Sequence, residues 1–119
     1  MLNDATGFRH VYLACGYTDL RRGIDGLVSI VKYNFDLNPC EEGSIFLFCG
    51  RRTDRIKALV YEGDGFLLLY KRLADGRFQW PRTTEEVKQL EMKQYRWLME
   101  GLNVEQKKAI KDVALSKFQ

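Results

Sequence analysis

The sequence predicts an α+β fold, in which an antiparallel β-meander of about four to five strands packs against one long N-terminal helix, with a smaller C-terminal helical part. Short apolar runs separated by turns that contain Gly and Asp fill the middle of the chain, which is typical of antiparallel strands. Upstream of them, apolar residues recur at intervals of three and four, which is helical spacing. The 119 residues suit a single α+β domain, predicted over 1–102, followed by a basic tail over 103–119 that is helical or disordered.

The N-terminal part is predicted to hold one strand and the long helix. HVYLA (10–14) is a short, partly β-branched apolar run that ends near a glycine, as a strand does. Thr18 or Asp19 is a candidate N-cap for an amphipathic helix over about 19–34. Two glycines interrupt this helix at a cost of about 1 kcal/mol each relative to alanine. We therefore expect either a tightly packed sheet or a binding partner to approach it closely.

The central part is predicted to form the meander. SIFLFC (44–49) follows an Asn-Pro break and reads as its first strand. Strands over 55–62 and 65–73 come next, joined by a two-residue Gly-Asp or Asp-Gly turn. A further Asp-Gly turn joins them to RFQW (77–80), which is predicted to be the fourth strand.

The chain beyond Pro81 shows weaker patterns. We expect an extended segment over 86–90, followed by a helix over about 93–101. Thr83 and Glu86 resemble a helix capping box. Gly101 is expected to end the helix, because glycine is favoured just beyond helix C-termini.

Alternation along 55–62 and 65–73 divides this hairpin into two faces, whichever turn joins the strands. The first face is mostly apolar and is expected to bury against the N-terminal helix; it comprises Ile56, Ala58, Val60, Leu67, Leu69 and Leu73. The second face mixes charge with aromatic rings and comprises Arg55, Lys57, Leu59, Tyr61, Phe66, Leu68, Tyr70 and Arg72. Lys71 falls at the margin of the first face. Phe78 and Trp80 fall on either face, depending on the length of the second turn.

Positive charge is concentrated in this central part. Eight basic and four acidic residues lie between positions 50 and 82, which gives +4 there in a chain whose total is +3. Arg and Lys neutralise phosphates, and aromatic rings stack on bases or pack on sugars. Arg and Tyr are also enriched at protein interfaces. The composition alone therefore leaves nucleic acid and protein open as partners.

The residues offer no recognisable active site, cofactor site or metal site. Nucleophilic catalysis needs a Ser or Cys with a base and an orienting group, and the single histidine, His10, lies in an apolar strand-like run. The chain has neither a phosphate-binding glycine motif nor zinc-ligand spacing, and the candidate aspartates are explained as cap, helix or turn residues. We therefore predict a protein that is not an enzyme and has no cofactor.

The cysteines and the first residues favour a cytoplasmic location. Cys15, Cys40 and Cys49 are odd in number, far apart and form no C-x-x-C pair, so reduced thiols are expected. MLNDATGFRH lacks the basic-then-apolar pattern of a secretory signal. The apolar runs are too short to cross a bilayer, so no membrane partner is expected.

Three long motifs resemble one known family. TDLRRGIDGL (18–27), GRRTDRIKALVYEGDGF (50–66) and LYKRLADGRFQWP (69–81) closely resemble the TnpB accessory proteins of the bacterial insertion-sequence family numbered sixty-six. The resemblance covers most of the chain, from about 10 to 102, in the right order and at short spacings. It says little about the tail.

The resemblance implies an accessory role in DNA transposition, a form of DNA recombination carried out by a mobile genetic element. In this family the element encodes a separate, larger transposase, which looks like a DDE enzyme, and a second small accessory protein. The family supplies no catalytic residues to carry over. An unrelated RNA-guided nuclease shares the name TnpB, but this chain is too short for that enzyme and shows none of its acidic motifs.

We therefore predict a non-catalytic accessory protein that binds DNA through a basic and aromatic sheet surface. The predicted partners are the insertion-sequence ends, the transposase and the second accessory protein. The alternative is an adaptor for the transposase without direct DNA contact, which would use apolar residues near Tyr61, Phe66 and Leu68. The predicted DNA-binding residues are Arg21, Arg22, Arg51, Arg52, Arg55, Lys57, Tyr70, Lys71, Arg72, Arg77 and Trp80. Arg21 and Arg22 are included because helix N-termini attract phosphate.

Overall fold

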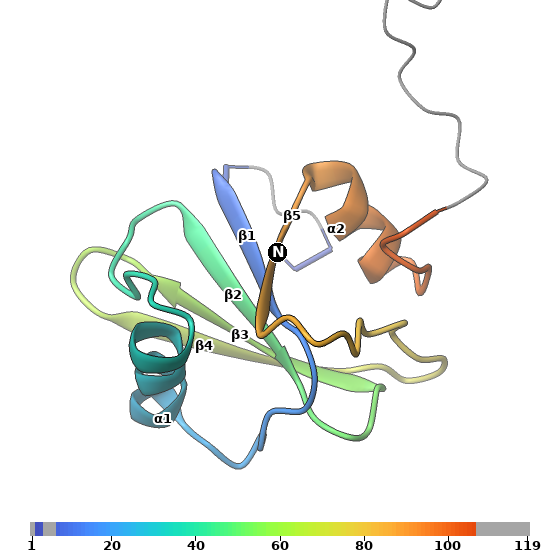
Figure 1. The fold of residues 1–119 in the computed structure, drawn as a ribbon, viewed down its shortest axis with the longest axis horizontal. Coiled ribbons are helices and arrows are strands. Elements are labelled where there is room, and N and C mark those ends of the chain that lie inside the picture. The colour runs from blue at the N-terminus through green and yellow to red at the C-terminus, as the bar shows by residue number, and fades with distance from the viewer. Residues whose placement is uncertain (1, 4–6, 107–119) are drawn as a thin grey trace, which may run out of the picture.

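A computed structural model of the chain describes residues 2–3 and 7–106 and shows a five-stranded mixed sheet with helical segments beside it (Figure 1). The elements in chain order are β1 (His10–Ala14), α1 (Ile24–Ser29), the π-helical segment η1 (Ile30–Asn34), β2 (Ser44–Cys49), β3 (Arg55–Tyr61), β4 (Phe66–Arg72), β5 (Val87–Leu90) and α2 (Met92–Met99). The strands lie in the spatial order β4-β3-β2-β1-β5. The predicted strands over 10–14, 44–49, 55–62 and 65–73 are all present.

The predicted fold class is wrong in the arrangement of the sheet. β1 pairs with β2 in parallel, whereas every other neighbouring pair is antiparallel. The physical reason is the helical crossover: parallel strands need a long connection, and α1 with η1 provides it between β1 and β2. The N-terminal strand thereby lies inside the sheet, between β2 and β5, and the molecule is not a simple meander.

The predicted long N-terminal helix is also wrong. The helical part begins only at Ile24, with Gly23 at the N-cap and no side-chain cap, and it changes to π-helical geometry at Ile30. The residues before it form a loop that is tied to the sheet, because the Thr18 amide donates a hydrogen bond to the Cys49 carbonyl. Asp19 accepts hydrogen bonds from Arg21 instead of capping a helix.

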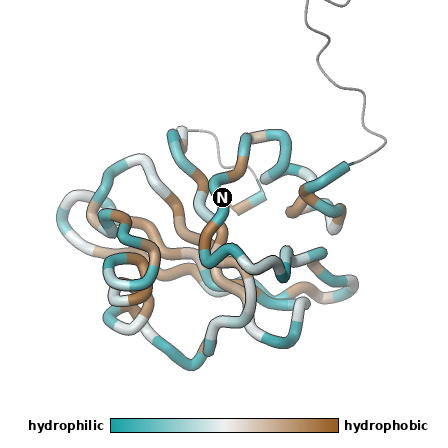
Figure 2. Tube along the Cα trace, in the orientation of Figure 1, coloured by the Kyte–Doolittle hydropathy of each residue, from teal (hydrophilic) through white to brown (hydrophobic). Residues whose placement is uncertain are grey.

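Both faces of the sheet are covered, and each cover differs from the prediction. Figure 2 shows apolar residues running along the central strands. One core cluster joins Ile56, Ala58 and Val60 to Tyr95 and Leu98 of α2. The other cluster joins Leu59, Phe66 and Leu68 to Leu27 and Val31 of the N-terminal helical part. The face predicted to lie beneath the N-terminal helix therefore packs against α2, and α1 covers part of the basic and aromatic face.

The predicted fourth meander strand over 77–80 is wrong, because this segment crosses the sheet without joining it. The Phe78 amide donates to the Thr53 carbonyl, and the Trp80 indole Nε1–H donates to the Ala14 carbonyl at 2.8 Å. Both rings are buried in the cluster beneath α2. Burial of these two large rings completes that core.

The C-terminal elements follow the sequence pattern more closely. β5 lies within the predicted extended segment, and α2 starts one residue before the predicted helix. The capping box, however, is formed by Glu91 and Gln94, not by Thr83 and Glu86. Gly101 lies just past α2 with a φ of 81°, as expected of a terminating glycine. The prediction of a helical or disordered tail falls mostly on 107–119, which lies outside the described residues.

Among the described residues, no helix combines the length and the apolar character needed to cross a membrane.

Candidate nucleic-acid interface

The basic residues gather at one end of the sheet because β1 and β2 run in parallel. The carboxyl ends of these strands, Ala14 and Cys49, lie at the same edge, so the loops over 15–23 and 50–54 leave the sheet side by side. Antiparallel β3 begins at this edge and β4 ends there, with Arg55 opposite Arg72. In open α/β sheets, ligands bind in the crevice outside the carboxyl ends of parallel strands.

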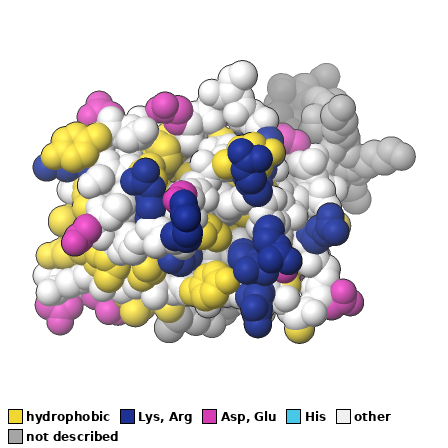
Figure 3. Space-filling model, turned by 90° about the horizontal axis from the view of Figure 1, so that it is seen from below, with side chains coloured by type: hydrophobic (Ala, Val, Ile, Leu, Met, Phe, Trp, Pro, Cys, Tyr) yellow, Lys and Arg dark blue, Asp and Glu magenta, His cyan; other side chains and the backbone are white. Residues whose placement is uncertain are grey.

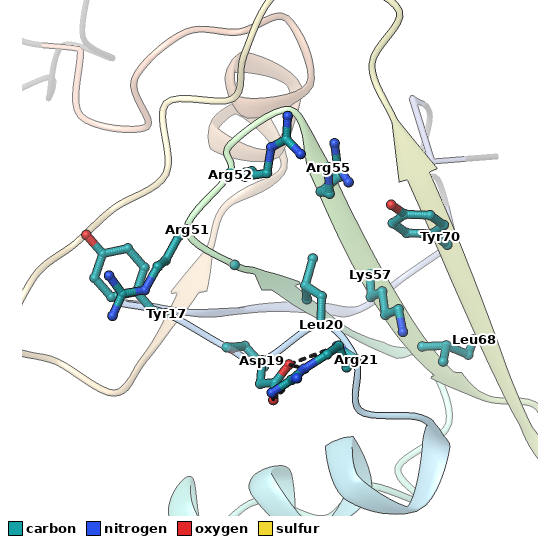
Figure 4. A pocket seen from close by; sticks show the side chains of 12 residues that line it. Tyr17, Asp19, Leu20, Arg21, Arg51, Arg52, Arg55, Lys57, Leu68 and Tyr70 are labelled. Carbon is teal, nitrogen blue, oxygen red and sulfur yellow. Dashed lines mark hydrogen bonds and ion pairs between the residues drawn. The ribbon is translucent and has the colours of Figure 1, made fainter.

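A pocket of about 890 Å³ opens at this edge (Figure 4). The side chains labelled in the figure come from both loops and from β3 and β4; they are Tyr17, Asp19, Leu20, Arg21, Arg51, Arg52, Arg55, Lys57, Leu68 and Tyr70. Leu20 and Leu68 are half-buried and pack against the core cluster that contains Leu27, Val31 and Leu59, which we call the α1-side core. Together they form an apolar floor. Cationic and tyrosine side chains surround it.

Tyr17 lies at one end of the pocket and is 65% exposed. Its ring is flanked by two guanidinium groups, whose carbons lie 5.3 Å (Arg51) and 4.0 Å (Arg82) from the ring centroid. Cation–π contacts of this kind favour Arg and hold it in place. Tyr17 therefore fixes the position of Arg51 at the rim.

Arg82 connects the loop after β1 to the loop after β2. It donates hydrogen bonds to the carbonyls of Gly16 and Gly50. Burial raises the pKa of the neighbouring Cys49 thiol to about 11, even though the nearby Arg82 charge acts in the opposite direction. Cys49 is therefore an uncharged thiol at neutral pH and does not form an ion pair with Arg82.

Tyr70 lies at the opposite end of the pocket from Tyr17 and is 55% exposed (Figure 4). The Lys57 ammonium lies 5.9 Å from its ring centroid and donates to the backbone carbonyl of Arg22 at 3.0 Å. Arg55 is paired with Asp54, with an Nε–Oδ1 distance of 2.9 Å. Hydrogen bonding to Arg55 lowers the pKa of the Asp54 carboxyl, so this pair stays ionised.

Arg21 forms a bidentate pair with Asp19 at the outer rim. Its Nε and one terminal nitrogen donate to the carboxylate at 3.0 and 2.9 Å. Hydrogen bonding to Arg21 lowers the pKa of Asp19 to about 2, so both groups are charged at neutral pH. Arg21 is 91% exposed and Asp19 partly neutralises it, so its excess charge is smaller than that of an unpaired arginine.

Three other arginines form no ion pair with a described residue, although the charge of Arg52 contributes to lowering the pKa of Asp54. In the part of the chain that the structure describes, no carboxylate lies within ion-pair distance of Arg51, Arg52 or Arg72. Arg51 and Arg52 also line a neighbouring hollow of about 550 Å³, whose other charged residues are Arg77, Asp54 and Asp75. Figure 3 looks onto this end of the molecule and shows Lys and Arg side chains spread across it, with hydrophobic side chains between them. This basic end can bind anions over more than one pocket.

The structure brings most of the predicted site residues together, but three lie elsewhere. Arg22 lines a separate hollow on the other side of the loop, beside Tyr33. Lys71 lies on the opposite face of β4 and donates to the Asn3 side chain. Trp80 is only 6% exposed and belongs to the core, so it cannot stack on a ligand at this surface.

Sequence reasoning does not find four residues of the site: Tyr17, Leu20, Leu68 as part of the floor, and Arg82 as the tie between the loops. The sequence signal that could have indicated Tyr17 is its position in the chain. Tyr17 follows directly on the glycine that ends the predicted strand over 10–14, and loops after strands commonly carry function. Arg82 lies in a segment without clear periodicity, so only the folded structure reveals its contacts.

The chemistry of the site is that of a binding surface. Its groups are guanidinium and ammonium donors, the Asp19 carboxylate that Arg21 pairs with, the Thr18 hydroxyl, two phenol rings and two leucine side chains. Within the described ranges, no three His, Cys, Asp or Glu side chains come together in a way that could hold a metal ion.

Comparison with known proteins identifies relatives over most of the chain. A family model described as IS66 Orf2 like protein matches residues 9–109. A Sinorhizobium fredii protein named uncharacterized protein y4hO is 34% identical over 93 residues, covering 78% of this chain and 80% of its own length. A second protein of that organism, uncharacterized protein y4jC, is 31% identical over 104 residues, covering 87% and 86%. No solved structure matches the chain.

Proposed function

Because the chain belongs to the IS66 Orf2-like family, which implies an accessory role in transposition, we propose that it fills this role by binding DNA through the basic end of its sheet. The family consists of accessory proteins and is not one of known enzymes. The proposed DNA is that of the insertion-sequence ends, on which the transposase acts.

The observation that carries the proposal is the group of arginines without carboxylate partners around the pocket. Arg51 and Arg52 line the pocket from the loop after β2, and Arg72 lies beside it at the end of β4, opposite the pocket residue Arg55. Partnered arginines are partly neutralised, whereas these retain their charge for a ligand. Clustered, unpaired cations attract the phosphate backbone, and this attraction supplies most of the non-specific affinity of DNA-binding proteins.

A protein adaptor is the competing function, since arginine and tyrosine also favour protein interfaces. The apolar patch expected for such an adaptor is reduced in the structure. Phe66 and Leu68 are half-buried against the α1-side core, and Tyr61 packs on Phe66 with ring centroids 5.0 Å apart. The opposite end of this hairpin, where Arg55 pairs with Arg72, carries the exposed positive charge, which favours DNA as the direct partner.

The proposal is tested by fluorescence anisotropy with labelled insertion-end duplex and a scrambled duplex across a salt series. The triple variant Arg51→Ala/Arg52→Ala/Arg72→Ala removes the unpaired charges. A control variant, Lys32→Ala/Lys93→Ala/Arg96→Ala, removes the same net charge from exposed positions that do not line the pocket.

We expect wild-type binding to weaken with salt. In the triple variant, the slope of log affinity against log salt should become shallower by about 0.9 for each phosphate that is no longer neutralised. The control variant should keep the wild-type slope to within about one phosphate. Absence of binding at low salt, or equal losses of affinity in both triple variants, would contradict the proposal. Capture of the transposase by a protein that does not bind DNA would instead support the adaptor.

A further inference from the structure

The pocket contains more than phosphate binding requires. Phosphate contacts need only cations at the surface, yet this pocket has an apolar floor of Leu20 and Leu68 and an exposed ring, Tyr70, at its edge (Figure 4). Its volume of about 890 Å³ is within the roughly 300–1,000 Å³ typical of pockets for small ligands. A flat, mostly apolar group bearing a nearby negative charge matches these features.

We infer that the pocket binds an unpaired nucleotide, with its base over the leucine floor against Tyr70 and its phosphates on Arg51 and Arg52. This inference rests on the proposed DNA-binding function and specifies the form of DNA that the site takes. In an intact duplex the bases are stacked and paired, so they cannot reach the floor of a pocket. The protein should therefore prefer DNA that has a single-stranded or locally unpaired segment.

The two tyrosines differ in what they can do for such a ligand. Tyr17 already has guanidinium groups near its ring, at 5.3 Å and 4.0 Å, and so acts as the support of Arg51. At Tyr70 the Lys57 ammonium lies 5.9 Å from the ring centroid and Arg55 hydrogen-bonds with the side chain, yet 55% of the residue is exposed. Tyr70 is therefore the ring on which a base can stack.

The flanking phosphates have a path out of the pocket. Arg51 and Arg52 line both the pocket and the hollow that Arg77 borders. A strand with one base in the pocket would lay its next phosphates across these two arginines toward Arg77. Sequence-independent stacking combined with a basic track is the usual chemistry of single-strand binding.

The test compares three labelled DNAs of insertion-end sequence: an intact duplex, the same duplex with a short unpaired segment, and the single strand. Each is titrated by anisotropy with wild type, Tyr70→Val and Tyr70→Phe. Valine keeps the β-branched character that suits a strand but removes the ring, whereas phenylalanine keeps the ring. Tyr33→Val is the matched control, because Tyr33 is 74% exposed and also lies near a lysine, with Lys32 5.3 Å from its ring centroid.

We expect wild type to bind the two DNAs with unpaired bases more tightly than the duplex, by roughly the 5- to 150-fold that one stacked base provides. Tyr70→Val should lose this preference, because its affinity for the DNAs with unpaired bases should fall much more than its affinity for the duplex. Tyr70→Phe and Tyr33→Val should retain the preference.

Two results would overturn the inference and leave the proposed function standing. One is equal affinity of wild type for all three DNAs. The other is a Tyr70→Val variant, folded by circular dichroism, that keeps the preference or loses duplex and unpaired binding alike. Absence of binding to any of the DNAs at low salt would overturn the proposed function and the inference together.

Discussion

The guanidinium carbon of Arg82 lies 4.0 Å from the centre of the Tyr17 ring, while the same side chain donates hydrogen bonds to the carbonyls of Gly16 and Gly50. Gly16 and Tyr17 belong to the loop after β1, and Gly50 begins the loop after β2. One arginine from the segment before β5 thus joins the two loops that form the pocket. The geometry of the proposed binding surface therefore depends on a residue that does not line the pocket.

Replacement of Arg82 should destabilise the protein and disturb the pocket. Each hydrogen bond from a charged donor contributes about 1.5–3 kcal/mol, so Arg82→Ala should lower the free energy of unfolding by at least about 2 kcal/mol. Arg82→Lys should recover only part of the stability, because lysine lacks the planar fork that reaches two carbonyls. Urea unfolding measures the free energy of unfolding of both Arg82 variants. Arg77→Ala, at an exposed position nearby, should stay within about 0.5 kcal/mol of wild type, and an equal effect of the Arg77 and Arg82 substitutions would refute this role.

Trp80 should act on stability and not on DNA affinity. Trp80→Ala removes a ring that is 6% exposed and should cost about 3–5 kcal/mol of unfolding free energy. Trp80→Phe keeps most of the packing but leaves the Ala14 carbonyl without the indole donor, so it should cost about 1–3 kcal/mol. Folded Trp80→Phe should bind DNA like wild type in the anisotropy assay. A selective loss of affinity at wild-type stability would show that the ring contacts the ligand.

The cysteines should differ sharply in reactivity. With its pKa raised to about 11 by burial, the Cys49 thiol is only about one-thousandth ionised at pH 8, and the thiolate is the reactive form. Cys40 is exposed and should be alkylated first when native protein is treated at pH 8 and analysed by mass spectrometry. Rapid native labelling of Cys49 would mean that this part of the core opens readily.

The Cys49 thiol should make the stability of the protein decrease at alkaline pH. The folded pKa of Cys49 lies above its ordinary value of 9.0, so the protonated thiol is favoured by folding. Its contribution to stability is complete below the ordinary pKa and decreases as the pH rises toward about 11. Denaturation at pH 9–11 should therefore show a steeper decline for wild type than for Cys49→Ala. Parallel declines would contradict this assignment.

Two glycines offer a matched test of backbone conformation. Gly101 has a φ of 81°, and an added Cβ would lie 3.4 Å from the Arg77 carbonyl oxygen, so Gly101→Ala should cost about 1–2 kcal/mol. Gly65 has no positive φ and no atom within 4 Å of an added Cβ, so Gly65→Ala should be neutral or stabilise by up to about 1 kcal/mol. Thermal unfolding of both variants checks the contrast. Similar melting temperatures would argue against the left-handed conformation at Gly101.

Except for the segment over 77–80, the sequence predicts the strands well, because each is a local pattern of apolar residues between turns. It does not predict their arrangement, because the order of strands and the parallel pairing of β1 with β2 depend on contacts between distant segments. The prediction of the buried hairpin face is wrong for a related reason. Leu59, Phe66 and Leu68 are apolar enough to pack under α1, and alternation alone does not tell which helix covers which face.

The residues of the candidate site also divide into those that local sequence patterns predict and those that only the folded structure reveals. Arg51, Arg52, Arg55 and Tyr70 can be predicted because they are close in sequence and their charge and aromatic character are visible there. The roles of Tyr17 and Arg82 cannot, since they arise from contacts across loops. The prediction that Trp80 lies at the surface depends on a strand over 77–80, whereas burial of its ring determines where that segment lies.

The most direct test of the central claim is an amide chemical-shift titration of the labelled protein with insertion-end DNA. We expect perturbations in the loops over 15–23 and 50–54, at the start of β3 and at the end of β4, and unchanged signals along the exposed side of α2. Perturbations confined to α2, or none at low salt, would contradict the claim that the basic end of the sheet binds DNA.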